Sequence, residues 1–174
     1  MAPGVPEVFL ASESAGRREH KVRSYLRSEP GISLLLAAVN FEWTVSRAVL
    51  CLSRTPNAEL RRKMAKYYSL DGCKDLWRAE VMPRGDQRPL PEIVQNWHDA
   101  RKAFEARNVL VHGKGRYTRN MATPHVEALL KAVGYVDAYC TALGVDLGHR
   151  MPVRRKLSVV GQQGAPAVPT LPCR

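Results

Sequence analysis

The sequence predicts an all-α fold, an up-and-down bundle of four or five helices. Apolar residues recur at intervals of three and four along several long segments, which is the period of a helix with one buried face. The alternating pattern of a strand is weak throughout the chain. With 174 residues and an apolar fraction of 45%, the chain has enough apolar side chains for one domain with a substantial core, and disorder throughout is excluded.

Composition favours a polyanionic partner. The formal net charge is +11, and a basic surface attracts polyanions and speeds their encounter without selecting among them. Nucleic acid is the polyanion that we expect, and a charge that serves solubility alone is the alternative.

We expect a cytoplasmic protein that is not inserted in a membrane. Residues 1–14 lack the basic start and long apolar segment of an export signal. No apolar run approaches the roughly 20 residues of a membrane-spanning helix. The cysteines are far apart and include no CxxC pair, so neither a disulfide framework nor a metal or other cofactor is expected; they are Cys51, Cys73, Cys140 and Cys173.

The first half of the chain is dominated by one core helix. Residues 1–14 contain two prolines and a glycine, and we expect them to be flexible. A basic helix is predicted over 15–28, and it stops before Pro30. The core helix follows over about 31–53, with Glu42 as a polar residue beside its apolar stripe. The stripe consists of Leu34, Ala38, Phe41, Val45, Ala48 and Leu52.

Shorter elements are predicted next. Residues 57–68 form a basic helix that is broken near Asp71-Gly72, and residues 73–82 add a short helical piece. Proline, glycine and charged residues indicate a loop over 83–91. Another long helix is expected over about 90–111.

The last helix is predicted to begin at Thr123, a good N-cap, with Pro124 in the first turn. Gly144 ends it. The helical domain therefore covers 15–149. Residues 150–174 mix basic residues with proline and glycine, and we expect them to form a disordered basic tail.

The helix predicted over 90–111 carries an arginine within its apolar stripe, which consists of Leu90, Ile93, Trp97, Ala100, Phe104, Arg107 and Val111. An unpaired buried charge is costly, so this arginine needs an anion or a place between two chains. One interpretation pairs Arg107 with Glu42 or Glu105 at the helix edge. The other leaves its planar guanidinium for a phosphate group.

His112 stands five residues after Arg107 and directly before Gly113. Five steps of roughly 100° separate the two side chains by about 140° on a straight helix, so they do not share a face. Gly113 indicates a helix end, where a histidine either acts as a simple cap that favours the helix dipole or takes part in chemistry.

The segment RNVLVHG, residues 107–113, resembles the signature of the HEPN superfamily. That signature is an arginine, usually followed by a polar residue, and then a histidine after four to six residues. Here four residues intervene between Arg107 and His112, and Asn108 occupies the polar position. The early core helix with Glu42 also resembles the helix of that family that bears an acidic residue.

The resemblance implies a helical bundle that pairs as a homodimer, with two copies of the motif in one cleft. Many members are metal-independent endoribonucleases of toxin–antitoxin systems or antiviral defence, so an antitoxin or a defence protein is an expected partner. In such a dimer Arg107 of one chain lies beside His112 of the other. Some HEPN toxins carry a tyrosine two residues after the histidine, and their antitoxin neutralises them by modifying it. This chain has Lys114 at that position, which argues against neutralisation of this kind.

These residue types suit RNA cleavage, because RNA supplies its own nucleophile in the 2′-hydroxyl group. His112 can take the 2′-hydroxyl proton or protonate the leaving 5′-oxygen. Arg107 can hold the phosphate and stabilise the charge that grows on its oxygens. Asn108 can orient the imidazole or the phosphate. The expected products are a 2′,3′-cyclic phosphate and a 5′-hydroxyl end.

The loop after His112 is basic and contains an aromatic residue, which suits it to bind single-stranded RNA by phosphate contact and base stacking; the residues are Lys114, Arg116, Tyr117 and Arg119. The alternative is a plain connector. Two other functions remain open. One is a HEPN module that binds RNA or a protein without cleavage, and the other is a DNA-binding regulator that uses helices 57–68 and 73–82.

Overall fold

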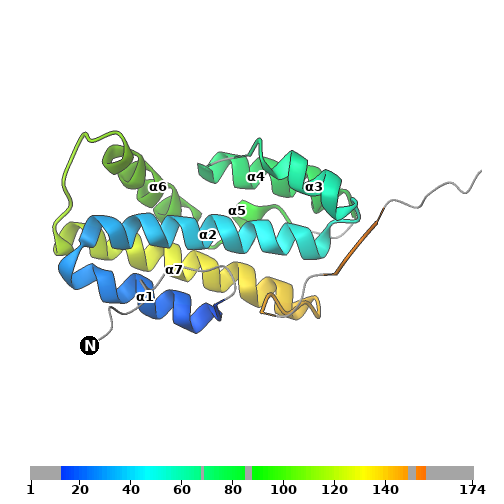
Figure 1. The fold of residues 1–174 in the computed structure, drawn as a ribbon, viewed down its shortest axis with the longest axis horizontal. Coiled ribbons are helices and arrows are strands. Elements are labelled where there is room, and N and C mark those ends of the chain that lie inside the picture. The colour runs from blue at the N-terminus through cyan, green and yellow to red at the C-terminus, as the bar shows by residue number, and fades with distance from the viewer. Residues whose placement is uncertain (1–12, 68, 85–87, 149–151, 156–174) are drawn as a thin grey trace, which may run out of the picture.

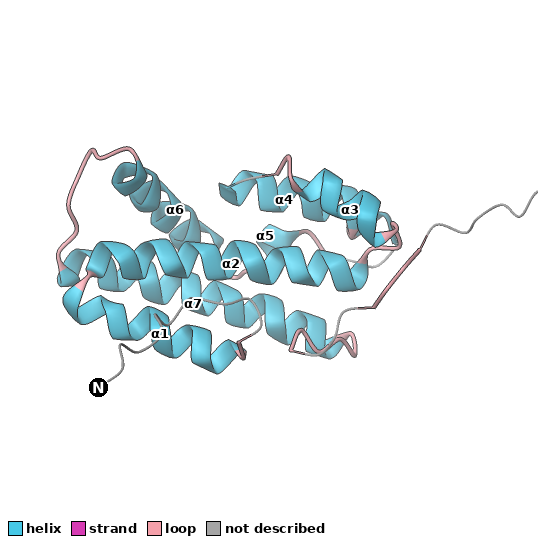
Figure 2. Ribbon diagram, in the orientation of Figure 1, coloured by secondary structure: helices cyan, strands magenta, loops and turns pink. Residues whose placement is uncertain are grey.

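The computed structural model describes residues 13–67, 69–84, 88–148 and 152–155. Every regular element in these ranges is helical, as Figure 2 shows, so the all-α prediction is confirmed for this part of the chain. The number of helices is larger than the four or five predicted. The described residues form seven α-helices and one 3-10 turn.

Three long helices lie side by side and form the base of the bundle (Figure 1). The two that are far apart in sequence, α2 and α7, run in the same direction, and α1 runs opposite to both. The intervening helices return the chain to the end at which α2 begins. The elements are α1 (Ala15–Ser28), α2 (Pro30–Leu52), α3 (Asn57–Met64), α4 (Ser69–Glu80), η1 (Met82–Arg84), α5 (Leu90–Ile93), α6 (Trp97–Val111) and α7 (Arg119–Ala142).

Helix α2 is the centre of the core, as its apolar period predicts. All six residues of its predicted stripe are buried, and the ring of Phe41 meets that of Phe104 of α6 edge to face, with centroids 5.8 Å apart. By length and composition alone α2 would also be long and apolar enough to cross a membrane, although its individual apolar runs are short. More than half of its most apolar stretch is buried inside the bundle.

Helix α4 runs through Asp71-Gly72, where the sequence predicted a break. Its first residue, Ser69, has a positive φ of 74°, and the Ser69 amide donates a hydrogen bond of 3.2 Å to Oε1 of Glu42. Gly72 is needed here for space: a Cβ at this position would lie 2.9 Å from the carbonyl carbon of Tyr67. The prediction was wrong because the glycine permits a close approach between two segments and does not end the helix.

The helix predicted over 90–111 is divided into α5 and α6. Val94, with φ −82° and ψ 85°, ends α5. The side-chain amide of Asn96 then donates a hydrogen bond of 2.9 Å to the carbonyl oxygen of Ala128 in α7. Apolar residues recur at helical intervals on both sides of the break, so their spacing alone did not reveal that the helix is divided.

Helix α7 begins before the predicted Thr123-Pro124 start. Thr118 is its N-cap, and its side chain accepts a hydrogen bond of 3.4 Å from the Met121 amide. The Thr123 hydroxyl instead donates to the carbonyl oxygen of Arg119 at 2.7 Å. Pro124 lies inside the helix, where it has no amide hydrogen to donate to the carbonyl oxygen four residues earlier.

Part of the predicted N-terminal flexible segment is attached to the bundle. Residues 1–12 lie outside the described residues. Ser14 caps α1 by accepting a hydrogen bond of 3.3 Å from the Arg17 amide, and Glu13 forms an ion pair of 2.7 Å with Lys21. Glu13 and Ser14, which the sequence placed in the flexible segment, therefore both contact α1.

Part of the predicted C-terminal tail is also attached. The guanidinium group of Arg154 donates hydrogen bonds to the carbonyl oxygens of Leu50 and Cys51 at the end of α2, and to that of Thr55. A cation suits this place because the last carbonyl groups of a helix lack partners within it. Residues 152–155 of the predicted tail thus contact the bundle, and residues 156–174 lie outside the described residues.

A buried carboxylate joins α4 to the connection between α2 and α3. Glu80 is only 8% exposed and accepts hydrogen bonds from Ser53 (2.9 Å), Thr55 (2.7 Å) and Lys63 (2.9 Å). Burial alone would raise the pKa of Glu80, but the bonds from these donors outweigh it and lower the pKa. This network was not predicted, because its partners are distant in sequence.

Candidate functional site

The segment that resembles the HEPN signature forms the last turn of α6. Gly113 has a positive φ of 65°, which glycine adopts readily. The Lys114 amide donates to the carbonyl oxygen of Val109 at 2.9 Å, and the Gly113 amide donates to that of Leu110 at 3.0 Å. This pair of bonds is a Schellman motif. It makes His112 the C-cap residue, at the helix end that the glycine predicted.

Gly113→Ala is expected to destabilise the protein by about 1 kcal/mol, because an L-residue in the left-handed region pays a steric cost. No atom of a described residue lies within 4 Å of the position where a Cβ would be added, so none of them would clash with it. Urea denaturation followed by circular dichroism measures the change. Gly16→Ala, in the exposed part of α1, is the control and should be neutral or stabilising. Equal stability of Gly113→Ala and the wild type would contradict the role of this glycine.

Arg107 is half-buried and makes few contacts. Its Nη1 donates a hydrogen bond of 3.1 Å to Oδ1 of Asn108. Among the described residues it forms no ion pair with an acid, so neither the predicted Glu42 pair nor the Glu105 pair has formed. Glu42 is nevertheless close enough for the charge of Arg107 to affect its pKa. Burial raises the pKa of Glu42, while the charge of Arg107 and the Ser69 amide partly oppose this rise.

Arg107 and His112 are not brought together within one chain. Helix α6 is regular through Val111, so about 140° separates the two side chains around the helix axis. His112 is exposed, and its side chain forms no hydrogen bond with any described residue. Val111 is 53% exposed and does not continue the predicted buried stripe. The reason is visible in Figure 1, where the C-terminal end of α6 diverges from α4.

The loop after α6 holds the residues that we predicted to bind RNA. Lys114, Arg116 and Arg119 are exposed. Tyr117 is half-buried, and its ring meets that of His125 edge to face with centroids 6.0 Å apart. The ring of Tyr117 therefore packs against its own chain. Less of its surface is open for stacking on a nucleobase than the sequence suggested.

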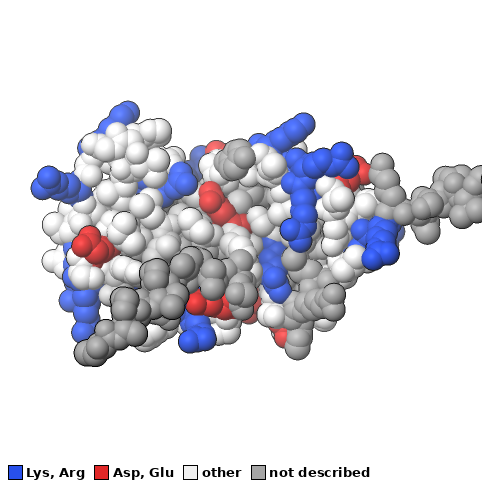
Figure 3. All heavy atoms as spheres, in the orientation of Figure 1, with Lys and Arg blue, Asp and Glu red and all other residues white. Residues whose placement is uncertain are grey.

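The outer face of α2, defined by Ile32, Leu35, Leu36 and Val39, is apolar and partly open. Ile32 is 42% exposed and Val39 is 43% exposed. Figure 3 shows a largely uncharged area over the first half of α2, with lysine and arginine side chains gathered towards the two ends of the view. This face lies beside α6, because Leu110 of α6 packs next to Gly31 at the start of α2.

A second charged residue, Arg18, was missed by the sequence reasoning. It precedes Val22 and Leu26 in steps of four along α1, so a charged residue stands in an apolar stripe, as Arg107 does in α6. The structure buries Arg18 to 5% exposure. The interrupted stripe would have revealed it, but the basic character of residues 15–28 masked that pattern.

Within the described residues, no three histidine, cysteine, aspartate or glutamate side chains lie close enough together to bind a metal ion. Comparison of the chain with known protein families, with curated proteins and with solved structures found no match.

Proposed function

We propose that this chain is a HEPN-type, metal-independent endoribonuclease that acts as a homodimer, as a toxin or an antiviral-defence effector. The observation that carries the proposal is the end of α6. Arg107, Asn108 and His112 reach solvent there, and the exposed basic residues Lys114 and Arg116 follow directly. Because no described acid pairs with Arg107, most of its donors remain for a phosphate group.

The proposed reaction needs only proton transfer and charge stabilisation. His112 removes the 2′-hydroxyl proton, the 2′-oxygen attacks the adjacent phosphorus, and the bond from phosphorus to the 5′-oxygen breaks. The leaving 5′-oxygen takes a proton from a water molecule, and the protonated His112 returns its proton to the hydroxide that remains, so each site needs a single His112. Arg107 binds the non-bridging oxygens, where negative charge grows. The products are a 2′,3′-cyclic phosphate and a 5′-hydroxyl end.

A second copy of the chain completes this site. Arg107 and His112 point in directions about 140° apart on one helix, so a phosphate bound to one is not reached by the other of the same chain. The outer face of α2 is the surface that we assign to the dimer. It is apolar, it borders α6, and two of its large side chains are more than 40% exposed.

Val39→Glu is expected to convert the dimer to a monomer and to abolish cleavage, because a carboxylate would have to be buried in an apolar interface. Sedimentation velocity measures the oligomeric state, and circular dichroism checks the fold. Val153→Glu is the matched control, since Val153 is 65% exposed and lies away from this face. A wild-type protein that sediments as a monomer would refute the assigned interface.

The function is tested by incubating the purified protein with labelled single-stranded RNA in EDTA. We expect cleavage, with ends that carry a 2′,3′-cyclic phosphate. RNA binding without cleavage would overturn the nuclease proposal in favour of a non-catalytic binding module. A preference for duplex DNA over RNA would overturn it in favour of a DNA-binding regulator.

A further inference from the structure

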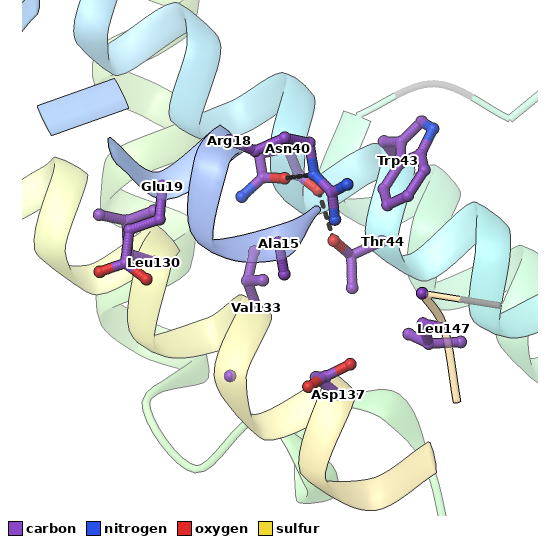
Figure 4. A pocket seen from close by; sticks show the side chains of 12 residues that line it. Ala15, Arg18, Glu19, Asn40, Trp43, Thr44, Leu130, Val133, Asp137 and Leu147 are labelled. Carbon is purple, nitrogen blue, oxygen red and sulfur yellow. Dashed lines mark hydrogen bonds between the residues drawn. The ribbon is translucent and has the colours of Figure 1, made fainter. Parts of the chain in front are cut away.

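A buried arginine faces a cavity between α1, α2 and α7, away from the proposed nuclease site. Arg18 is held on three sides: its Nε donates to Oδ1 of Asn40 at 2.9 Å, its Nη1 donates to the carbonyl oxygen of Glu13, and its guanidinium carbon lies 3.8 Å from the ring centroid of Trp43. Figure 4 shows Arg18 and Asn40 beside the cavity and Asp137 across it. The arginine is thus fixed in one orientation.

Two side-chain donors of buried residues, Nη2 of Arg18 and the amide nitrogen of Asn40, are open to this cavity. Arg18 is 5% exposed and Asn40 is 2% exposed, and both line the cavity. No described residue accepts a hydrogen bond from Nη2 of Arg18 or from the amide nitrogen of Asn40. Burial lowers the pKa of Arg18, and the nearby charge of Arg47 lowers it further, while the charges of Asp137 and Glu13 partly oppose this lowering. A bound anion would therefore stabilise the charged guanidinium group.

The cavity has the volume of a small organic molecule. It measures about 160 Å³, and an apolar cavity of ~150 Å³ holds a benzene ring. Leu130, Val133 and Leu147 form an apolar wall. Asp137 is an exposed lining residue that carries negative charge at the opening, whereas Glu19 is paired with Arg23 at 2.8 Å. Asp137 would repel a simple carboxylate but would attract the cation of a ligand that carries both charges.

We propose that this cavity binds an α-amino acid with a medium-sized apolar side chain. The carboxylate accepts hydrogen bonds from Arg18 and Asn40, which suits the planar guanidinium group. The ammonium group faces Asp137, which forms no ion pair with any described residue. The side chain packs against Leu130 and Val133. This site is independent of Arg107 and His112.

Thermal denaturation of the full chain with added L-leucine tests the proposal, with L-isoleucine, L-methionine and L-phenylalanine in parallel. A saturable rise in Tm is expected for at least one of them, reaching roughly 5–10 °C at about 100 times the dissociation constant. For leucine, two analogues isolate the charged groups. Isocaproate lacks the ammonium group and leucinamide lacks the carboxylate, and each should bind at least about tenfold more weakly, the loss expected for one charged contact.

Three variants locate the site. Gly134 lines the cavity, and no atom of the described part of the chain lies within 4 Å of a Cβ added there, so Gly134→Leu should fold and narrow the cavity. It should lose the response to the amino acid, whereas Gly16→Leu, outside the cavity, should keep it. Asp137→Asn should fold normally and weaken binding at least about tenfold.

Either of two results would overturn the site: no saturable shift with any of the four amino acids, or a full shift in Gly134→Leu. Isocaproate that binds as tightly as leucine, or unchanged binding by Asp137→Asn, would overturn the amino-acid assignment.

Discussion

Arg107→Ala and His112→Ala are each expected to reduce RNA cleavage by a factor of about 10²–10⁴, the usual contribution of a general acid–base or a charge-stabilising group. Neither change should alter the fold. Arg107 is half-buried with one hydrogen bond to its neighbour Asn108, and His112 is exposed at the helix end. Exposed residues without structural contacts rarely change stability by more than about 0.5 kcal/mol. His20→Ala and Arg27→Ala, on the exposed side of α1, are the matched controls.

Mixing the two inactive variants distinguishes a shared site from a site within one chain. If Arg107 of one chain works with His112 of the other, a mixed dimer has one site with both residues intact and one site with both replaced. Random pairing of equal amounts should then restore about a quarter of the wild-type activity, since half of the dimers are mixed and each has one working site. A co-expressed or co-refolded mixture that stays inactive would contradict a site shared between two chains.

Glu80→Ala is expected to destabilise the protein by about 1–3 kcal/mol, because it leaves the buried Ser53 hydroxyl without its acceptor and removes the bonds from Thr55 and Lys63. Ser53, Thr55 and Lys63 all donate to this carboxylate. Urea denaturation measures the free energy of unfolding. Glu105→Ala, on the exposed side of α6, is the control and should change it by less than about 0.5 kcal/mol. A similar small change for Glu80→Ala would show that the network contributes little.

The same carboxylate should make stability depend on pH in the acid range. The pKa of Glu80 is lowered in the folded protein by its donors, so the folded state favours the ionised form. Its contribution is fully present above the unfolded pKa of about 4.3 and is lost as the pH falls through the lower folded pKa. Glu80→Ala should therefore be less sensitive to acid than the wild type. An unchanged acid dependence would show that other carboxylates control it.

Local patterns predicted much of the fold. The spacing of apolar residues identified α2 as the core helix, and all six stripe residues are buried. Gly113 placed His112 at a helix end because only local backbone bonds are needed to form that end. The boundaries that failed depend on distant partners. Asn96 separates α5 from α6 through a bond to α7, and Gly72 passes close to Tyr67.

The sequence by itself determined that this protein is helical, that an arginine and a histidine stand near the end of one helix, and that they do not share a face. Only the tertiary structure decided which of the charged residues in apolar stripes are buried. Arg18 is 5% exposed because Asn40 and Trp43 of α2 and the carbonyl of Glu13 contact it, whereas Arg107 remains half-buried because α6 diverges from α4. Periodicity shows the direction in which a side chain points, but burial depends on whether another helix is there to meet it.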